Sequence, residues 1–285
     1  MLSLIEKEKQ TENIKWSKPD FSTKTGRELL AFYLQSKLKK IVAHDQKNEI
    51  PIFMEIQPDF ISKFSRRLID NPNQRIMIAL TGESASGKTT ICQTIKEAIE
   101  KFGMPIEIIS ADNYFNDISE LIAKYGTFDA LRDNGYDIDS PENFQLNILL
   151  EDLTKIKNGE DIKIPKYLVN GTGVSVPKAI DKYSKKIVIV EGMATVYQNI
   201  KDIFDIKIYV DADKQTQKDR FLKRAAERNQ DNENALKHWD YVQIASQKYV
   251  LPQKNECDVV INGTANLDYY RHFLEYMYVI TNSFT

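Results

Sequence analysis

Nine consecutive residues, beginning at position 82, have the types and spacing that suit a phosphate-binding loop. They are Gly82, Glu83, Ser84, Ala85, Ser86, Gly87, Lys88, Thr89 and Thr90. The first eight match the pattern GxxxxGK[ST] in full, with Lys88 placed to reach the β- and γ-phosphates of a nucleotide and Thr89 to ligate Mg²⁺. The two glycines let the backbone turn so that successive N–H groups point at phosphate oxygens. The segment therefore predicts a binding site for ATP and Mg²⁺.

Two acidic residues each follow a short apolar run. Asp112 comes directly after residues 108–111, and Glu191 comes directly after residues 187–190. At the carboxyl edge of a parallel sheet, both carboxylates would lie on the side of the phosphate loop. Asp112 could then accept the proton of an attacking hydroxyl, and Glu191 could hold Mg²⁺ directly or through water. A capping role for Asp112 and a structural role for Glu191 are the alternatives.

Four cations follow residues 211–213 on a predicted helix: Arg220, Lys223, Arg224 and Arg228. Spacings of three and four place them on adjoining faces of that helix. A movable cationic helix could close over a triphosphate and stabilise the charge of a transition state. The alternative is a solvated helix face, paired with Asp219 and Glu227.

The elements expected to position these side chains alternate between strand and helix. Five short, β-branched apolar runs predict strands, at residues 76–80, 106–109, 187–190, 206–210 and 259–261. Helices are expected over residues 89–102, and from Ser140-Pro141-Glu142, with Ser140 as N-cap, to Asn158-Gly159. Such runs, separated by helices, indicate a parallel sheet buried on both faces. The predicted fold class is α/β: a P-loop NTPase fold with helices flanking the sheet, a helical lid and an N-terminal helical extension.

The N-terminal part of the chain differs from the rest in its pattern of residue types. Its apolar residues recur at helical spacing and predict a helix over residues 29–40. The turn residues Asn71-Pro72-Asn73 are a plausible join. We therefore predict a partly helical extension over residues 1–72 and a P-loop domain over residues 73–285.

The bulk composition excludes several classes of protein. The formal net charge of −2 over 285 residues gives no global basic field, so neither nucleic acid nor an anionic membrane is the expected partner. The apolar runs are too short to cross a bilayer. Cys92 and Cys257 form no CxxC pair, which favours free thiols in a reducing compartment and hence the cytoplasm. The DxxG and NKxD signatures of switch GTPases do not occur, nor does the LSGGQ signature of transport ATPases.

An ordered set of segments resembles the uridine kinase family, within the wider uridine kinase, phosphoribulokinase and pantothenate kinase superfamily. The resemblance covers about residues 75–266. It comprises TGESASGKTT at 81–90, DNYF at 112–115, YDIDSPENF at 136–144, IPKY at 164–167, VIVEGM at 188–193, IYVDAD at 208–213, RFLKRAAERNQD at 220–231 and LPQKNECDVVING at 251–263. The phosphate loop is generic, whereas the ordered set is much more specific.

The resemblance implies a role for each matching position. Lys88 and Thr89 would serve phosphate and Mg²⁺, Asp112 would be the catalytic base, and Glu191 would be a carboxylate associated with Mg²⁺. Asp139 and Arg220 would hold ribose hydroxyls, and Tyr167 would lie beside the nucleobase. Arg224 or Lys223, together with Arg228, would be the lid cations.

Two departures from the family pattern concern the acceptor. Thr172 stands where a uridine kinase typically has a base-recognising histidine, and Gln230 stands where an arginine is common. Because a lost reading group relaxes or changes specificity, the identity of the acceptor stays open. The N-terminal helical extension is closer to the pantothenate kinase branch.

These observations predict ATP- and Mg²⁺-dependent phosphoryl transfer to a hydroxyl of a small molecule, with the 5′-hydroxyl of uridine or cytidine as the expected acceptor. One alternative keeps the mechanism and changes the acceptor to pantothenate or a sugar-type alcohol. Another is a nucleotide-binding regulator that has lost turnover. A stretch of aromatic residues near the C-terminus suits core packing or a subunit contact, which leaves a homo-oligomer possible.

Overall fold

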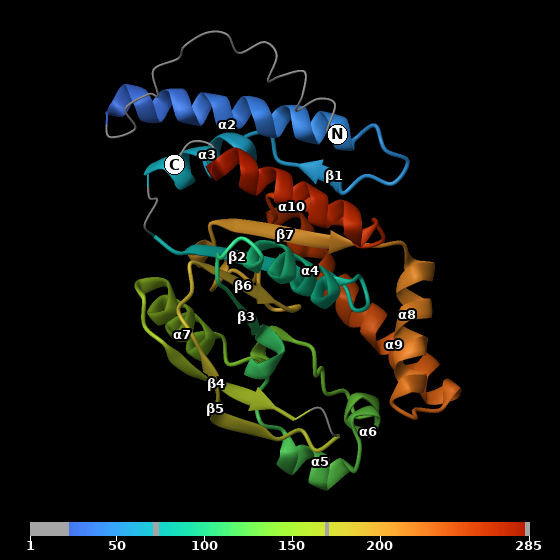
Figure 1. Ribbon diagram of the computed structural model, residues 1–285. Helices are drawn as coiled ribbons and strands as arrows, with labels where there is room; N and C mark the ends of the chain where they lie inside the picture. The colour runs from blue at the N-terminus through green and yellow to red at the C-terminus, as the bar shows by residue number, and fades with distance from the viewer. Residues whose placement is uncertain (1–22, 71–73, 169–170, 283–285) are drawn as a thin grey trace.

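The computed structural model describes residues 23–70, 74–168 and 171–282 (Figure 1). Within these ranges the strands form a six-stranded sheet in the order β1-β8-β7-β2-β6-β3. Its strands are β1 (Phe53–Ile56), β2 (Ile76–Thr81), β3 (Ile106–Ser110), β6 (Ile187–Glu191), β7 (Ile206–Asp211) and β8 (Val259–Asn262). The five strands predicted from apolar runs are confirmed, and they pair in parallel. All five residues of β6 are buried, as expected for a strand covered on both faces.

The sheet also has an edge strand that the sequence did not reveal. Strand β1 pairs with β8 in the antiparallel direction, so the sheet is mixed rather than wholly parallel. Two of the four residues of β1, Met54 and Glu55, are exposed, and so the strand lacks a continuous apolar run. The division of the chain at residue 72 stays a prediction, although residues on both sides of it contribute strands to one sheet.

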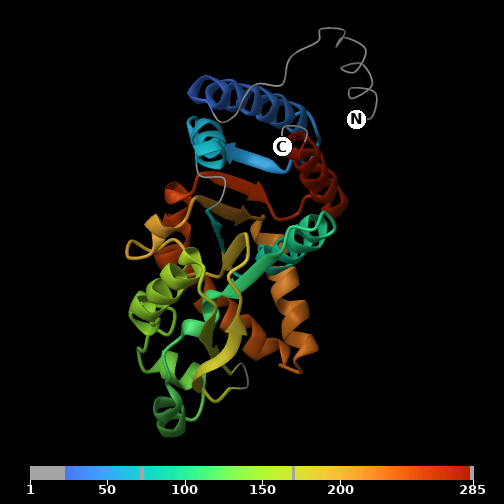
Figure 2. The ribbon, with the colours of Figure 1, turned by 60° about the vertical axis from the view of Figure 1, so that its left-hand side comes forward.

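Helices cover both faces of the sheet (Figures 1 and 2). On one face, α4 (Lys88–Glu100) and α10 (Leu267–Asn282) pack together, and Ile91, Cys92 and Tyr270 join the core formed with the strands. On the other face, α7 (Leu146–Asn158) contributes Leu149, Leu153 and Ile156 to a second core. The predicted helix over residues 89–102 is confirmed within about two residues at each end.

The helix predicted to start at Ser140 begins later. Pro141–Asn143 form a separate 3-10 turn, and α7 starts at Leu146. Phe144 is in extended conformation and bridges to Phe115, which prevents the helix from running through this position. The side chain of Ser140 donates to Glu142 rather than capping a backbone N–H. The predicted end is confirmed, because Gly159 caps α7 in the left-handed conformation.

Between β3 and β6 the chain forms what we call the β4–β5 lobe, residues 111–186. It contains α5 (Ser119–Tyr125), α6 (Phe128–Asp133), α7 and the antiparallel strands β4 (Ile162–Tyr167) and β5 (Ser175–Lys182). Its first turn, η1 (Ala111–Tyr114), packs against β4. The lobe extends from the edge of the sheet formed by β3 (Figure 1).

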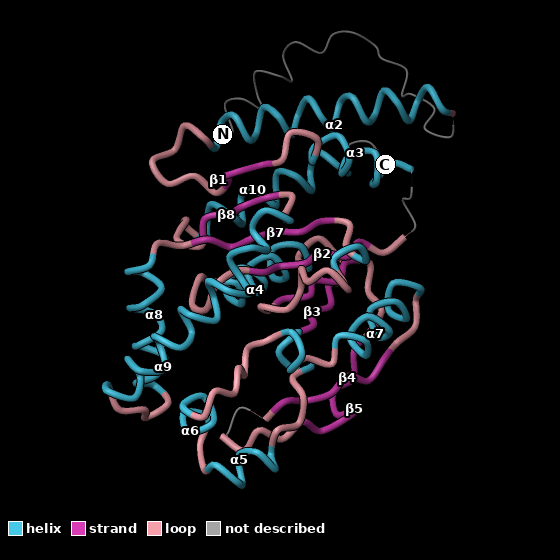
Figure 3. The backbone as a smooth tube through the Cα atoms, turned by 180° about the vertical axis from the view of Figure 1, so that it is seen from behind, coloured by secondary structure: helices cyan, strands magenta, loops and turns pink. Residues whose placement is uncertain are grey.

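Two helices after β7 form a hairpin that we call the lid. They are α8 (Lys214–Glu227) and α9 (Asn232–Ala245), and Asp213 and Asp231 cap them by accepting N–H bonds from Thr216 and Asn234. The lid stands beside the carboxyl ends of the strands (Figure 3). A π-turn, Ser246–Val250, and a 3-10 turn, Leu251–Glu256, then lead into β8. The predicted lid helix is confirmed as a helix.

The described N-terminal residues form α2 (Lys24–Asp45) and α3 (Phe60–Asp70), which pack against each other. The predicted helix at 29–40 is therefore confirmed and is longer at both ends. The buried carboxylate of Asp45 accepts the backbone N–H groups of Ile52 and Phe53, at 3.0 and 2.9 Å, and so fixes the turn into β1. Arg67 on α3 pairs with Asp205, at 2.8 Å.

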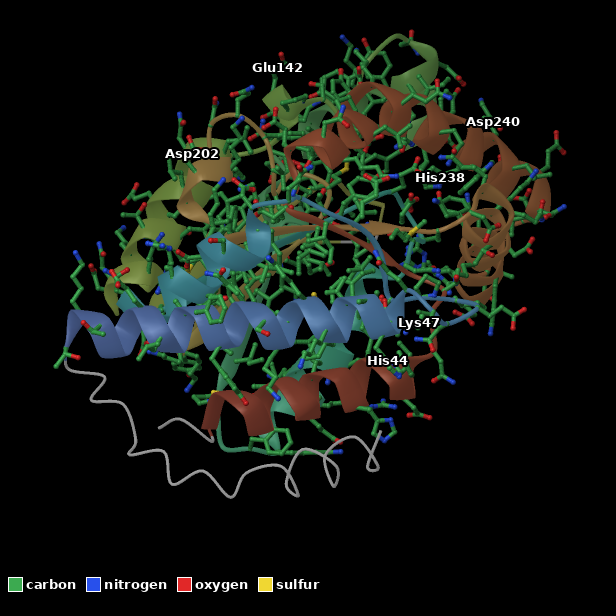
Figure 4. The ribbon with its side chains drawn as sticks, turned by 90° about the horizontal axis from the view of Figure 1, so that it is seen from above. His44, Lys47, Glu142, Asp202, His238 and Asp240 are labelled. Atoms are coloured by element: carbon green, nitrogen blue, oxygen red, sulfur yellow. The ribbon has the colours of Figure 1, made fainter. Side chains whose placement is uncertain are left out.

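The histidines are dispersed, as their positions in the sequence suggest. Figure 4 shows His44 near the end of α2 and His238 on α9, on separate elements. Among the described residues, no three His, Cys, Asp or Glu side chains gather as metal ligands. Within the same ranges, no helix has the length and apolar character needed to span a membrane.

Candidate active site

A cavity of about 650 Å³ lies at the carboxyl edge of the sheet. The phosphate loop forms its floor, and the lid and the β4–β5 lobe supply its walls. Most of the site residues predicted from the sequence line it: Ser84, Ala85, Gly87, Lys88, Thr89, Thr90, Asp112, Asp139, Glu191, Arg220, Arg224 and Arg228. Gly82, Glu83 and Ser86 are buried residues of the loop itself, and Tyr167 lies at the end of β4, outside the residues that line the cavity.

The phosphate loop joins β2 to α4 in a conformation that requires its glycines. Gly82 has a φ of +142°, and a Cβ there would lie 2.3 Å from the carbonyl oxygen of Val210 on the neighbouring strand. Gly87 is left-handed and precedes the first residue of α4. The loop thereby directs backbone N–H groups and the N-terminus of α4 into the cavity, which favours a bound anion.

Lys88 lies folded over the loop. Its Nζ donates to the carbonyl oxygens of Gly82 and Glu83, at 2.8 and 2.9 Å. Burial lowers the pKa of Lys88, while the nearby carboxylates of Asp112 and Glu191 act in the opposite direction. The ammonium group is therefore held at the centre of the site, within electrostatic reach of both acids.

The register of the sheet brings Glu191 beside the loop. Glu191 is paired with Leu80 on one side and with Ser110 on the other, so it ends its strand between the phosphate loop and Asp112. The hydroxyl of Thr89 donates to the Glu191 carboxylate, at 3.3 Å. Hydroxyl and carboxylate oxygens suit Mg²⁺, which usually takes its remaining ligands from phosphates and water. The two side chains fit such an ion.

Asp112 follows β3 in the turn η1 and faces the open cavity. Burial among the surrounding protein atoms and the nearby Glu191 carboxylate together raise the pKa of Asp112 to about 6, against the opposing effect of Lys88. The backbone N–H of Met193 hydrogen-bonds to the carboxyl group. A carboxyl group with a pKa near neutrality can act as a general base.

Asp139 and Tyr167 lie on the β4–β5 lobe. Burial raises the pKa of Asp139, and Arg132 opposes this from 3.7 Å. The ring of Tyr167 lies 5.3 Å from that of Phe115, and the rings of Phe115 and Phe144 are 4.0 Å apart. Asp139 lies within electrostatic reach of Tyr167 and lines the cavity, whereas Phe115 and Tyr167 are not among the residues that line it.

Arg220 belongs to α8, and its side chain lies against the phosphate loop. Its guanidinium donates to the carbonyl oxygens of Ala85, Ser86 and Gly263, at 3.4, 3.2 and 3.1 Å. The cation that pairs with Asp139 is Arg132, which no sequence motif identified. The guanidinium of Arg220 is held by carbonyl groups of the loop and of Gly263. Its expected role beside Asp139 in holding ribose hydroxyls stays a prediction.

The other lid cations differ in their surroundings. Arg224 donates to the hydroxyl of Ser84, at 3.2 Å, and its guanidinium lies 5.7 Å from the ring centre of Phe221. Arg228 is exposed at the end of α8 and lines the cavity. Lys223 is exposed and is not among the residues that line the cavity. Of the four cations predicted for the lid, Arg224 is thus the one with a hydrogen bond to a side chain of the phosphate loop among the described residues.

The two residues that depart from the family pattern lie in turns between elements. Thr172 is exposed in the turn between β4 and β5, and Gln230 is partly buried in the turn between the lid helices. Thr172 therefore belongs to the β4–β5 lobe and Gln230 to the lid, whereas the phosphate loop connects β2 of the sheet to α4.

Comparison with known proteins gives a consistent result. A model of the phosphoribulokinase / uridine kinase family matches residues 77–268. Uridine-cytidine kinase B of Dictyostelium discoideum is 31% identical over 192 residues, 65% of this chain and 73% of that protein. Uridine kinase of Staphylococcus epidermidis is 30% identical over 193 residues, 66% of this chain and 88% of its own.

A solved structure from Silicibacter sp., provisionally assigned as a fructose transport system kinase, resembles this fold with a TM-score of 0.50. The two sequences are 17% identical, and the match covers 66% of this chain and 90% of the other. This likeness concerns the fold alone.

Proposed function

Since the chain belongs to the phosphoribulokinase / uridine kinase family and is a P-loop small-molecule kinase, we propose that it transfers the γ-phosphoryl group of ATP to the 5′-hydroxyl of uridine or cytidine. The observation that carries the proposal is the convergence of Lys88, Asp112 and Glu191 at the mouth of the phosphate loop. A positive charge, a base of raised pKa and a carboxylate beside a hydroxyl are the parts that phosphoryl transfer needs.

Separate residues of this chain would stabilise the phosphate charge and accept the proton of the acceptor hydroxyl. The loop N–H groups and Lys88 would bind the β- and γ-phosphates, and Arg224 would stabilise charge on the transferring group. Thr89 and Glu191 would hold Mg²⁺, which supplies further neutralisation of phosphate charge when bound. Asp112 would orient the acceptor hydroxyl and take its proton as the oxygen attacks phosphorus.

The proposed acceptor follows from the β4–β5 lobe and from the relatives. Phe115 and Tyr167 offer a surface on which a planar base could stack. Asp139 could accept hydrogen bonds from two neighbouring hydroxyls of a ribose. The relatives named above carry the names uridine kinase and uridine-cytidine kinase. A pyrimidine ribonucleoside has both the flat ring and the paired hydroxyls.

A side-by-side acceptor screen tests the proposal. Purified protein with ATP and Mg²⁺ is given uridine, cytidine, pantothenate or a sugar alcohol, and release of ADP is measured. We expect turnover with a pyrimidine nucleoside and a phosphorylated product of matching mass. Turnover with pantothenate or a sugar alcohol alone would move the acceptor to the alternative class. ATP binding without product from any of these acceptors would instead favour a regulator.

A further inference from the structure

Glu83 is a charged side chain buried inside the phosphate loop. Its side chain is only 3% exposed, and its carboxylate accepts hydrogen bonds from Lys214, Gln217 and Ser246. Burial alone would raise the pKa of Glu83, but these hydrogen bonds outweigh burial and hold the pKa below its ordinary value. A buried carboxylate is stable only when partners satisfy it, and all three partners belong to the lid or to the turn that follows it.

The partners of Glu83 stand at the two roots of the lid. Lys214 is the first residue of α8, and Ser246 directly follows the last residue of α9. Lys214 also donates to Gln243 on α9, at 2.8 Å, which joins the two roots to each other. One carboxylate of the phosphate loop therefore binds both points at which the hairpin leaves the rest of the chain.

From its root, α8 lies with one face against the loop. Gln217, Arg220 and Arg224 recur at intervals of three and four and so lie on one face of the helix. Their contacts fall on four adjacent loop residues: Gln217 on Glu83, at 3.1 Å, Arg220 on the carbonyls of Ala85 and Ser86, and Arg224 on Ser84, at 3.2 Å. A shift of the root would displace Arg224 from Ser84.

We propose that Glu83 is a positioning residue, which fixes both roots of the lid to the phosphate loop and thereby holds Arg224 beside the transferring phosphoryl group. The inference rests on the phosphoryl transfer proposed above. Glu83 needs no contact with the substrate, because it acts through the placement of Arg224.

The substitution Glu83→Gln tests this role, because glutamine keeps the shape and removes the charge. We expect kcat to fall by about tenfold or more, since a misplacement of about 1 Å can cost about 10²-fold. The Kd of a non-hydrolysable ATP analogue should change by less than about twofold, because loop N–H groups and Lys88 bind the phosphates. The matched control is Asp219→Asn, which removes a carboxylate that accepts from Gln215 one turn earlier on α8. Its kcat should stay within about twofold of the wild type.

A double-mutant cycle separates positioning from general damage. If Glu83 acts through Arg224, Glu83→Gln should lower kcat by less than about twofold in an Arg224→Gln background, so that the two losses do not add. Losses that add in full, or an unchanged kcat in the single variant, would overturn the proposal.

Hydrogen exchange distinguishes failure of this inference from failure of the proposed function. In Glu83→Gln, the backbone amides of α8 should exchange faster than in the wild type, while those of α7, on the opposite face of the sheet from α4, should not change. If the wild type phosphorylates no acceptor, the proposed function fails, and the exchange of α8 still decides whether Glu83 anchors the lid. If Glu83→Gln does not fold, Lys214→Gln, at the 52% exposed partner, replaces it with the same expected direction. Unchanged exchange of α8 in the folded variant would contradict the anchoring.

Discussion

The carboxyl group of Asp112 lies within electrostatic reach of Lys88, Glu191 and Asp139. A second carboxylate beside a base makes the base harder to ionise and therefore a stronger proton acceptor near neutral pH. The raised pKa and the position at the end of β3 together single out Asp112 among the acidic residues that line the cavity.

Replacement of Asp112 with Asn should remove the proton acceptor and keep the rest of the site. We expect turnover to fall by about 10² to 10⁴-fold, the usual contribution of a general base. Binding of ATP should be retained, because the phosphate loop and Lys88 are untouched. Steady-state rates and a titration with an ATP analogue measure the two quantities. Retained turnover in this variant would remove Asp112 from its proposed role.

The pH dependence of the rate should report the same group. Asp112 must be ionised to accept a proton, and its pKa is raised to about 6 from an ordinary value of 3.8. The rate should therefore decline as pH falls through about 6, whereas an unshifted aspartate would keep it level to about pH 4. The profile of kcat/KM for ATP reports the free enzyme. A level profile down to pH 5 would show that no group of this pKa limits the reaction.

At the scale of elements, the carboxyl ends of β2, β3 and β6 bring the site together. Glu191 is followed by Gly192, whose φ of +144° lies outside the range of most side chains. A Cβ at Gly192 would lie 3.0 Å from Oδ1 of Asp112 and 3.0 Å from Cβ of Ala111. The glycine thus lets the ends of β3 and β6 approach so closely that the two carboxylates interact.

Gly192→Ala should damage stability and catalysis together. Backbone strain costs of order 1–3 kcal/mol, and the added methyl group would push the Asp112 carboxylate from its place. Gly103→Ala is the matched control, because Gly103 also has a positive φ, of +77°, but nothing lies within 4 Å of its Cβ. We expect Gly192→Ala to lose at least about 1 kcal/mol more of unfolding free energy than the control. Equal losses, with turnover intact in both variants, would contradict this account of Gly192.

The sequence predicted those elements whose own residue pattern is typical of their structure. The parallel strands were found because burial on both faces gives continuous apolar runs, and the phosphate loop was found because its geometry restricts residue types. Strand β1 was missed because an edge strand with an exposed Glu55 has no such run. Arg132 was missed because its pairing with Asp139 depends on how α6 folds back on the lobe. The lid cations were predicted as a set, but their separate partners on the loop depend on tertiary packing.

At the scale of the whole molecule, the cavity lies between the sheet, the lid and the β4–β5 lobe. Side-chain contacts join these three parts to one another. Glu83 joins the lid to the sheet, and two exposed carboxylates join α9 and the turn after it to the β4–β5 lobe. Asp133 accepts from Lys237 and Tyr241, and Asp137 accepts from Lys248 and Tyr249. Such exposed pairs are individually weak and are screened by salt. The attachment of the lid to the lobe is therefore weaker than its attachment to the buried Glu83.

The N-terminal segment is the fourth part, and its contacts indicate that it stabilises the sheet. Ile52 is almost fully buried, β1 pairs along the edge of β8, and Arg67 holds Asp205 at the start of β7. Asp205 in turn accepts the backbone N–H of Met77 in β2, at 2.9 Å. A chain without this segment would expose the edge of β8 and leave Asp205 without its cation.

A chain of residues 73–285 should therefore be less stable than one of residues 23–285, which keeps every described element. We expect a loss of more than about 3 kcal/mol in unfolding free energy, the scale of one large buried apolar side chain together with a broken ion pair. Denaturant unfolding of both chains measures the difference. Turnover per folded molecule should change little, because all the proposed catalytic residues follow β2. If the two chains unfold at the same denaturant concentration, the N-terminal segment is an accessory to a self-sufficient P-loop domain, and the predicted boundary at residue 72 would describe the molecule correctly.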